Sequence, residues 1–311
     1  MLKIVEGKAI PLPNFEEHIK SIEEIEIELT GTCNLDCPIC LRTINNPGKN
    51  KLSVDFWIDT IKSFPNLKRI CIAGSYSEPT LYKGLFDIIK YLGTTKLQCE
   101  FYTNSSLYDK DYWRELGKIF PENIKIYFTI CGTTEELHQK YRRGSTLKKV
   151  LENAYAFLET YKYKNDYLQY IKFSWNLKDA YSPEYYAILN NFHNEEKIES
   201  IPYNERFSID NEEYNMISHS DAFLKIKENT LKLFEEDSTK KPNIYCKSIE
   251  NKFLYIDQYG VSHPCFIFAK EHKFYNQFTF NDINENKFNS CWGCDTSCVS
   301  KLNRLKIDRM E

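Results

Sequence analysis

Short apolar runs rich in β-branched and aromatic residues recur along the first two-thirds of the chain, with longer amphipathic stretches between them. The apolar runs predict strands, which we expect at residues 25–29, 69–73, 97–103, 124–130, 170–175 and 198–201. The amphipathic stretches predict helices at residues 54–64, 81–92, 107–119, 147–161 and 183–192. Ser53 is the expected N-cap of the first helix, and Pro65 lies just past its end.

Strands that alternate with helices indicate βαβ units and a parallel sheet. A complete eightfold βα barrel needs about 250 residues, or about 31 per unit, so that six units need about 190. The alternating part runs from about residue 22 to about residue 215. We therefore expect an α/β fold, a partial (β/α)6 TIM-like barrel, although an open parallel sheet fits the periodicity equally well.

The pattern changes after residue 215. Residues 222–234 predict one amphipathic helix, and residues 252–268 predict two short strands joined at Gly260, which can take a positive φ in the turn. We therefore expect two domains, a barrel over residues 1–215 and a small β-hairpin plus helix domain over residues 216–311.

Composition narrows the classes of function. The chain has 41 Lys plus Arg against 44 Asp plus Glu, and this balance argues against a nucleic-acid or membrane-surface patch. No apolar run approaches the roughly 18 residues of a transmembrane helix, and the first residues lack the apolar region of a secretory signal. We expect a cytoplasmic protein that binds neither nucleic acid nor membrane.

Cysteine is the unusual residue, with 11 in the chain. Cys33, Cys37 and Cys40 follow the first expected strand, and this spacing lets three thiolates converge on zinc or on an iron–sulfur core. Three ligands leave one iron of a four-iron cube open, whereas a structural zinc site is normally closed by four. No fourth Cys or His lies close by, which leaves a zinc site completed from a distance as the alternative.

The Cys-x3-Cys-x2-Cys spacing after the first strand resembles the radical SAM superfamily, whose members share a partial βα barrel. The resemblance implies a [4Fe–4S] cluster at Cys33, Cys37 and Cys40 and a bound S-adenosylmethionine (SAM). In that family the reduced cluster cleaves SAM to methionine and a 5′-deoxyadenosyl radical, which abstracts a hydrogen atom from a substrate C–H bond. The electron donor is expected to be a flavodoxin or a ferredoxin.

Further motifs at the expected strand ends resemble the family's cofactor-binding segments. The segment from Gly74 to Pro79 is similar to a Gly-Glu-Pro motif that holds the amino group of SAM, although Ser77 stands where a second glycine is common. Thr103-Asn104-Ser105 resembles a Thr-Asn-Gly turn. The implied cofactor-binding residues are Gly74, Ser75, Ser77, Glu78, Pro79, Asn104, Thr129 and Arg142.

Two of these motif positions carry alternatives. Arg142 can clamp the SAM carboxylate through two hydrogen bonds, or it is a solvated surface arginine. Cys131 stands where the family frequently has Asp. It is either a small filler at the barrel mouth or a catalytic thiol that gives a hydrogen atom to a substrate radical. Cys71 and Cys99 lie inside expected strands and are expected core thiols.

A second group of cysteines lies near the C-terminus. Cys246, Gly260 and Cys265 match the start of the family's SPASM extension, and Cys291, Cys294 and Cys298 follow. Five thiols cannot complete two four-iron cubes, which favours the shortened twitch version with one auxiliary [4Fe–4S] cluster. Its expected ligands are Cys246, Cys265, Cys291 and Cys294, with Cys298 as a spare, alternate or redox thiol. A zinc ribbon is the alternative.

The resemblance leaves two substrate classes. Most SPASM relatives modify peptides or protein side chains, whereas some single-auxiliary-cluster members oxidise or epimerise aminocyclitols and sugars. Only 32 residues precede Cys33, too few for a separate leader-binding domain, but family frequency places peptide modification slightly ahead. A catalytic Cys131 or Cys298 would favour epimerisation over net oxidation. A non-catalytic iron–sulfur or zinc scaffold is the hypothesis from another class.

Overall fold

A computed structural model describes residues 2–5, 8–11, 19–38, 40, 42, 52–73, 77–199, 252–260 and 262–263. Within these residues a parallel sheet contains β3 (Glu24–Ile27), β4 (Arg69–Ile72), β5 (Gln98–Thr103), β6 (Ile124–Ile130), β7 (Asp166–Lys172) and β8 (Asn194–Glu199). These six strands pair in chain order. The sheet does not close on itself, because β8 lies at one edge. The prediction of an α/β fold with a six-unit partial barrel is confirmed.

The other edge of the sheet carries the expected hairpin. Strand β9 (Phe253–Ile256) pairs in parallel with β3, and β10 (Ser262–His263) pairs with β9 in the antiparallel sense. Gly260 has a φ of +75° in the turn, and a Cβ at this position would lie 2.3 Å from Cζ of Phe56. A hairpin that we assigned to a second domain therefore extends the sheet of the first. The boundary near residue 215 lies outside the described residues and stays a prediction.

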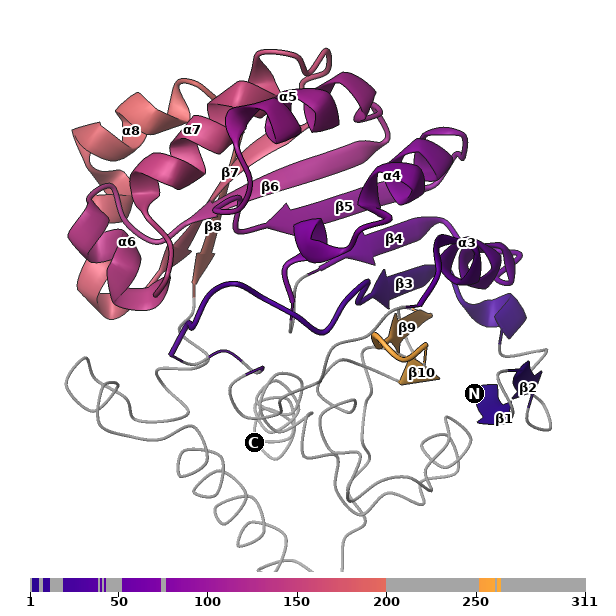
Figure 1. The fold of residues 1–311 in the computed structure, drawn as a ribbon. Coiled ribbons are helices and arrows are strands. Elements are labelled where there is room, and N and C mark those ends of the chain that lie inside the picture. The colour runs from indigo at the N-terminus through magenta and orange to yellow at the C-terminus, as the bar shows by residue number, and fades with distance from the viewer. Residues whose placement is uncertain are drawn as a thin grey trace, which may run out of the picture.

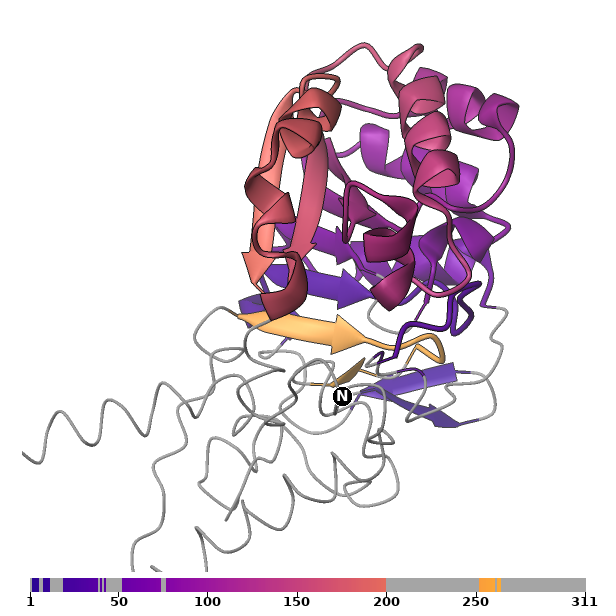
Figure 2. The same ribbon diagram turned by 90° about the vertical axis from the view of Figure 1, so that its left-hand side faces the viewer.

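Helices cover one face of the curved sheet (Figures 1 and 2). They are α3 (Val54–Lys62), α4 (Leu85–Gly93), α5 (Lys110–Ile119), α6 (Glu135–Tyr141), α7 (Leu147–Leu158) and α8 (Pro183–Leu189). Single 3₁₀ turns form at Pro79–Leu81, Ser174–Asn176 and Asp179–Tyr181. Ser53 caps α3 as predicted, since its Oγ accepts a hydrogen bond from the Phe56 N–H at 3.1 Å. None of the described helices is long and apolar enough to cross a bilayer.

Alternation along the strands separates two environments. Residues such as Ile27, Ile72, Phe101 and Phe128 belong to one buried apolar cluster together with helix residues such as Trp113. Successive strand residues point to opposite faces, so that Glu100, Tyr102, Tyr127 and Gln169 lie on the face opposite the described helices. Burial of each large apolar side chain contributes about 1.5–3 kcal/mol, which makes this core the main stabilising element of the sheet.

Several boundaries differ from the predictions. Strand β7 begins at Asp166 rather than at residue 170, because the Asp166 carboxylate is buried and accepts hydrogen bonds from His193 N and Nδ1 at 2.9 and 2.7 Å. Helix α4 begins at Leu85 rather than at residue 81, since Glu78 caps a separate 3₁₀ turn there. Helix α6 and a two-stranded hairpin, β1 (Leu2–Val5) with β2 (Lys8–Pro11), were not expected.

Candidate active site

The three-cysteine loop leaves the carboxyl end of β3. Cys37 is 8% exposed, and Cys33 and Cys40 are half-buried. The Cys40 N–H donates to the Cys37 carbonyl at 3.1 Å, and the Leu35 N–H donates to Cys33 Sγ at 3.5 Å. The three thiols are close enough to interact electrostatically with one another. The structure therefore brings the three predicted ligands together in one turn of chain.

The chemistry of this donor set fits an iron–sulfur cube. Burial, with the nearby Glu78, raises the pKa of Cys33 to about 11, and burial raises that of Cys37 to about 12 although Arg142 opposes it. Buried thiols of this kind become thiolates when a metal replaces the proton. Among the described residues no group of three or more Cys, His, Asp or Glu is arranged to hold a single metal ion. Soft thiolate sulfurs such as these three are typical ligands of iron–sulfur clusters.

Asn104 fixes the cysteine loop from the end of β5. Its Nδ2 donates to Asn34 Oδ1 at 3.0 Å and lies 3.7 Å from Cys33 Sγ. Asn34 in turn donates to Ser106 Oγ at 2.8 Å. The next residue, Ser105, has a φ of +47°, a conformation that glycine adopts most easily and that the Thr-Asn-Gly turns of the resemblance supply. Asn104, predicted at the cofactor, therefore contacts a predicted cluster ligand directly.

Glu78 joins three segments at this end of the sheet. Its carboxylate is 2% exposed and accepts hydrogen bonds from Thr80 N and Oγ1, Thr103 Oγ1 and Asn104 N at 3.2, 2.8, 2.7 and 2.7 Å. Its own N–H donates to the Thr32 carbonyl at 2.8 Å, which ties the loop after β4 to the cysteine loop. Burial raises the pKa of Glu78, and the four donors oppose this by favouring the charged form.

The neighbours of Glu78 are placed as follows. Ser77 is buried and donates to Glu28 Oε2 at 2.5 Å, and Pro79 is the first residue of the 3₁₀ turn. Gly74 and Ser75 lie outside the described residues. The predicted role of this segment toward the amino group of SAM therefore stays a prediction.

Thr129 lies near the end of β6, on the face of the sheet opposite the described helices. Its Oγ1 donates to Gln169 Oε1 at 2.9 Å, and Gln169 Nε2 donates to Glu196 Oε2 at 2.7 Å. Three neighbouring strands thus contribute one polar row next to the cysteine loop's end of the sheet. This row was not predicted, because no local motif marks Gln169 or Glu196.

Arg142 follows α6 and lies against two thiols. Its guanidinium hydrogen-bonds to Cys131 and interacts with Cys37. Its Nε is buried and has no hydrogen-bond partner within the described part of the chain. Burial alone would lower the pKa of Arg142, but the neighbouring Cys131 and Cys37 more than reverse that effect. Arg142 is thus half-buried beside the cysteine loop, with a donor left for an acceptor group.

Cys131 is completely buried at the end of β6, and burial raises the pKa of its thiol. Sequence reasoning missed the residues that hold it. The Cys131 N–H donates to His138 Nδ1 at 3.5 Å, and the Cys131 carbonyl accepts from Asn176 Nδ2 at 2.8 Å. His138 is buried, which with the charge of Arg142 lowers its pKa to about 4 and keeps it neutral. The only sequence signal for His138 is its position four residues before Arg142.

The other cysteines divide between the core and the part of the chain that is not described. Cys99 is 1% exposed and belongs to the apolar core, as predicted. Cys71 is instead half-buried on the opposite face of the sheet, where burial and then Glu26 raise its pKa. The predicted auxiliary ligands Cys246, Cys265, Cys291 and Cys294, together with Cys298, lie outside the described residues.

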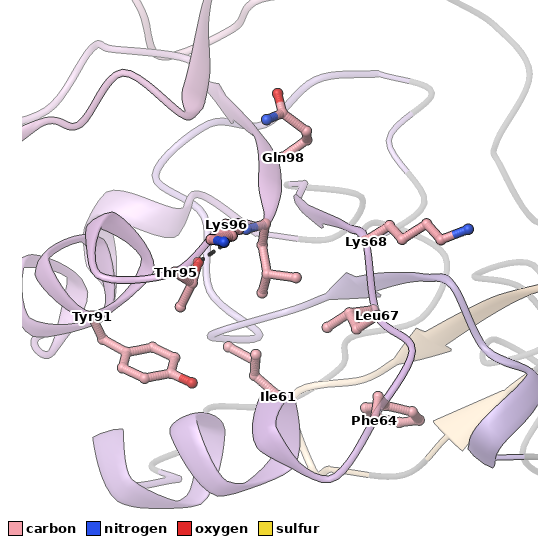
Figure 3. Close-up of a pocket in the computed structure, with 9 residues that line it drawn as sticks. Ile61, Phe64, Leu67, Lys68, Tyr91, Thr95, Lys96 and Gln98 are labelled. Atoms are coloured by element: carbon pink, nitrogen blue, oxygen red, sulfur yellow. Dashed lines mark hydrogen bonds between the residues drawn. The ribbon is translucent and has the colours of Figure 1, made fainter.

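A cavity of about 470 Å³ lies at the opposite, amino-terminal end of the strands (Figure 3). It is lined by Ile61, Phe64, Leu67, Lys68, Tyr91, Thr95, Lys96, Leu97 and Gln98. None of the predicted site residues contributes to it. Because ligands of parallel α/β sheets bind at the carboxyl ends of the strands, we assign the site to the cysteine loop rather than to this cavity.

Comparisons with known proteins bear on the family and on the fold. The sequence profile of the radical SAM superfamily matches residues 27–166. The structure of Streptococcus suis SuiB bound to precursor peptide SuiA has 16% identity and a TM-score of 0.59, over 91% of this chain and 69% of that one. SuiB bound to S-adenosylmethionine has 14% identity and a TM-score of 0.56, over 85% and 64%. The chain spans about two-thirds of these SuiB chains.

A third solved structure is similar as well. Native anSMEcpe with bound AdoMet and Kp18Cys peptide has 15% identity and a TM-score of 0.52, over 85% of this chain and 82% of that one. A search of curated proteins finds no match. At these identities the structures establish the fold alone. The family comparison is confined to residues 27–166, which match the radical SAM superfamily and have the three-cysteine loop near their start.

Proposed function

We propose that the chain is a radical SAM enzyme whose active site lies at the carboxyl ends of β3 to β6. The observation that carries this proposal is the convergence of Cys33, Cys37 and Cys40 within the matched domain, beside Asn104 and Arg142. A cluster held there would supply the electron for reductive cleavage of SAM, the chemistry by which the family abstracts hydrogen from a substrate C–H bond.

The residues of the chain have separate tasks in this proposal. The three thiolates would hold the cluster, and a fourth ligand position would stay open for SAM. Asn104 orients Cys33 through its amide, and Glu78 holds the Asn104 backbone and the cysteine loop in register. The free Nε donor of Arg142 suits the SAM carboxylate. Gly74, Ser75, Ser77 and Thr129 complete the proposed cofactor contacts.

The C-terminal cysteines are proposed to hold one auxiliary [4Fe–4S] cluster through Cys246, Cys265, Cys291 and Cys294. Strand β9, which lies shortly after Cys246 in the sequence, pairs with β3, the strand that leads into the three-cysteine loop. This pairing supports a C-terminal part anchored next to the first site. A zinc ribbon at the same cysteines is the outcome that iron and zinc analysis would distinguish.

Peptide modification is the substrate class that we propose. SuiB is bound to a precursor peptide, and anSMEcpe to a peptide, in structures that share this fold over most of the chain. The complete burial of Cys131 disfavours it as a hydrogen-atom donor, since a donor must reach the substrate. Epimerisation through Cys131 is therefore not favoured, and our proposal is peptide oxidation or crosslinking. Epimerisation through Cys298, which lies outside the described residues, stays a prediction. Turnover of an aminocyclitol or sugar instead of a peptide would contradict this choice.

The decisive experiment is anaerobic reconstitution followed by reaction with SAM and a reduced flavodoxin or ferredoxin. The wild-type chain should bind about eight irons and form 5′-deoxyadenosine. Cys37→Ala should lose about four irons and all of the product, whereas Cys99→Ala, a buried cysteine in the core, should keep both. A Cys37→Ala variant that still forms 5′-deoxyadenosine at the wild-type rate would refute the proposal. A wild-type protein that binds iron but forms no 5′-deoxyadenosine would indicate a scaffold.

A further inference from the structure

Cys131 is fixed from three sides at the carboxyl end of β6. Its backbone N–H and carbonyl are held by His138 and Asn176, at 3.5 and 2.8 Å. The next residue, Gly132, leaves no space for a side chain, because a Cβ would lie 2.3 Å from Cβ of Leu137. The Cys131 side chain is itself 0% exposed. The position of this sulfur is therefore set by the surrounding protein residues.

The group that this sulfur contacts is the guanidinium of Arg142, which donates a hydrogen bond to it. The Arg142 N–H donates to the His138 carbonyl at 2.9 Å, so that the same histidine holds both residues. The chain just after Arg142 touches the cysteine loop. The Asp36 N–H donates to the Arg143 carbonyl at 2.9 Å, and a Cβ on Gly144 would lie 3.4 Å from the Asn34 carbonyl oxygen.

We propose that Cys131 is a positioning residue whose sulfur holds the Arg142 guanidinium against Cys37, and so keeps a positive charge beside the three-cysteine cluster. This inference rests on the cluster proposed above. The guanidinium donates to Cys131, and its buried Nε has no hydrogen-bond partner within the described part of the chain and could donate to an anionic group. Arg142 would then have two roles, as a positive charge beside the cluster and as a hydrogen-bond donor to the cofactor. In this proposal both roles depend on the Cys131 thiol, which itself touches neither substrate nor cofactor.

The charge has a measurable consequence for the cluster. Reduction adds one negative charge to the iron–sulfur core, and a nearby cation stabilises the reduced form. Loss of the cation, or of the sulfur that holds it, should therefore make reduction harder. We expect at least a tenfold change in the reduction equilibrium, which is about 59 mV for one electron.

Serine separates this role from hydrogen-atom donation. In Cys131→Ser the hydroxyl still accepts a hydrogen bond from Arg142, but its strong O–H bond cannot give a hydrogen atom to a carbon radical. A positioning role therefore survives the change to serine and fails with alanine. A donor role fails with both. Cys131→Val, which restores volume without an acceptor, replaces alanine if the alanine variant does not retain iron.

The test is an anaerobic redox titration of the full-length holoenzyme, following the part of the electron paramagnetic resonance signal that changes when SAM is added. Cys131→Ala and Arg142→Gln should both lower the midpoint potential by at least about 59 mV, which is a tenfold change in the reduction equilibrium, and both should weaken SAM binding. Cys131→Ser should stay within about threefold of wild type, and Cys99→Ala should not change, because Cys99 lies in the core away from Arg142.

The outcomes are distinguishable. An unchanged potential in Cys131→Ala, with iron present, overturns the positioning role and leaves the proposed function intact. A serine variant as defective as alanine also overturns it. A serine variant with normal potential that forms no epimerised product, where the wild type forms one, overturns the claim that Cys131 acts only through Arg142, because it shows that the thiol also gives a hydrogen atom. The absence of iron at the cysteine loop of the wild-type protein overturns both proposals together.

Discussion

The two ends of the same sheet differ in the burial of their polar side chains. At the amino-terminal end, Glu23 pairs with Lys68 and Lys252, and Glu24 pairs with Arg69, all at least partly exposed. At the carboxyl-terminal end, Glu78, Asn104, His138 and Cys131 are buried. Exposed pairs contribute little, about 0–1 kcal/mol, whereas buried polar groups are costly when a partner is lost. Substitutions at the two ends should therefore differ sharply.

The largest difference should be in catalysis. Replacement of any of Cys33, Cys37 or Cys40 by Ser should reduce 5′-deoxyadenosine formation at least about 1,000-fold, because each thiolate is a soft cluster ligand that a hydroxyl does not replace. Rapid-quench assays with saturating SAM measure this. At the other end, Lys68→Ala should leave the rate within about twofold, since an exposed ion pair contributes little. Equal losses at both ends would remove the distinction.

Stability should show the next largest effect, at Glu78. Glu78→Ala removes the acceptor for four hydrogen bonds and leaves buried donors unpaired, for an expected loss of about 3–5 kcal/mol. Glu24→Ala, at the exposed end, should cost about 0.5 kcal/mol. Urea unfolding of the metal-free proteins measures both. A cost below about 1 kcal/mol for Glu78→Ala would mean that this network is not a structural clamp.

Acidification should next affect His138. Burial lowers its folded pKa to about 4, so that the unfolded chain binds a proton at higher pH than the folded one does. Its contribution is therefore present above pH 6.5 and lost as the pH falls from about 6.5 to about 4, by about 2–3 kcal/mol. Unfolding free energies of wild type minus His138→Gln over this range measure it. If the difference in unfolding free energy between wild type and His138→Gln did not change with pH, the imidazole of His138 would not be buried in its neutral form.

The smallest effect should come from Glu23, at the exposed end. Hydrogen bonds from Lys252 and Lys68 lower its pKa from 4.5 to about 2. A carboxylate with a lowered pKa stabilises the fold above the unfolded pKa, and this contribution disappears as the pH falls from about 4.5 to about 2. The effect should shrink in high salt, unlike that of His138. Wild type against Glu23→Gln, with and without 1 M salt, provides the comparison.

The sequence predicts the regular part of the fold well because its signals are local. Helix α3 with its Ser53 cap and strand β6 were predicted within two residues, since apolar periodicity and capping act within a few positions. The cysteine loop was predicted for the same reason, because its ligands lie seven positions apart at most. The start of β7 was predicted four residues too late, because the buried Asp166 is hydrogen-bonded to His193, which lies just before β8 and far away in the sequence.

What could not be predicted are contacts between segments far apart in the sequence. The pairing of β9 with β3 joins residues 253–256 to residues 24–27, and no pattern in either strand names the other. The clamp around Cys131 needs Asn176, which comes from a stretch without any motif. Glu78 was identified as a cofactor residue, but its hydrogen bonds to Thr103 and Asn104 became visible only when the strand ends met.

The most direct test of the central claim is Mössbauer spectroscopy of ⁵⁷Fe-reconstituted protein in which Cys246, Cys265, Cys291, Cys294 and Cys298 are all replaced by Ala. One [4Fe–4S] cluster per chain should remain, and SAM should change the spectrum of one iron of the four. A protein that folds, judged by its circular dichroism, yet binds no iron at Cys33, Cys37 and Cys40, or binds a cluster that does not respond to SAM, would contradict the assignment of the active site.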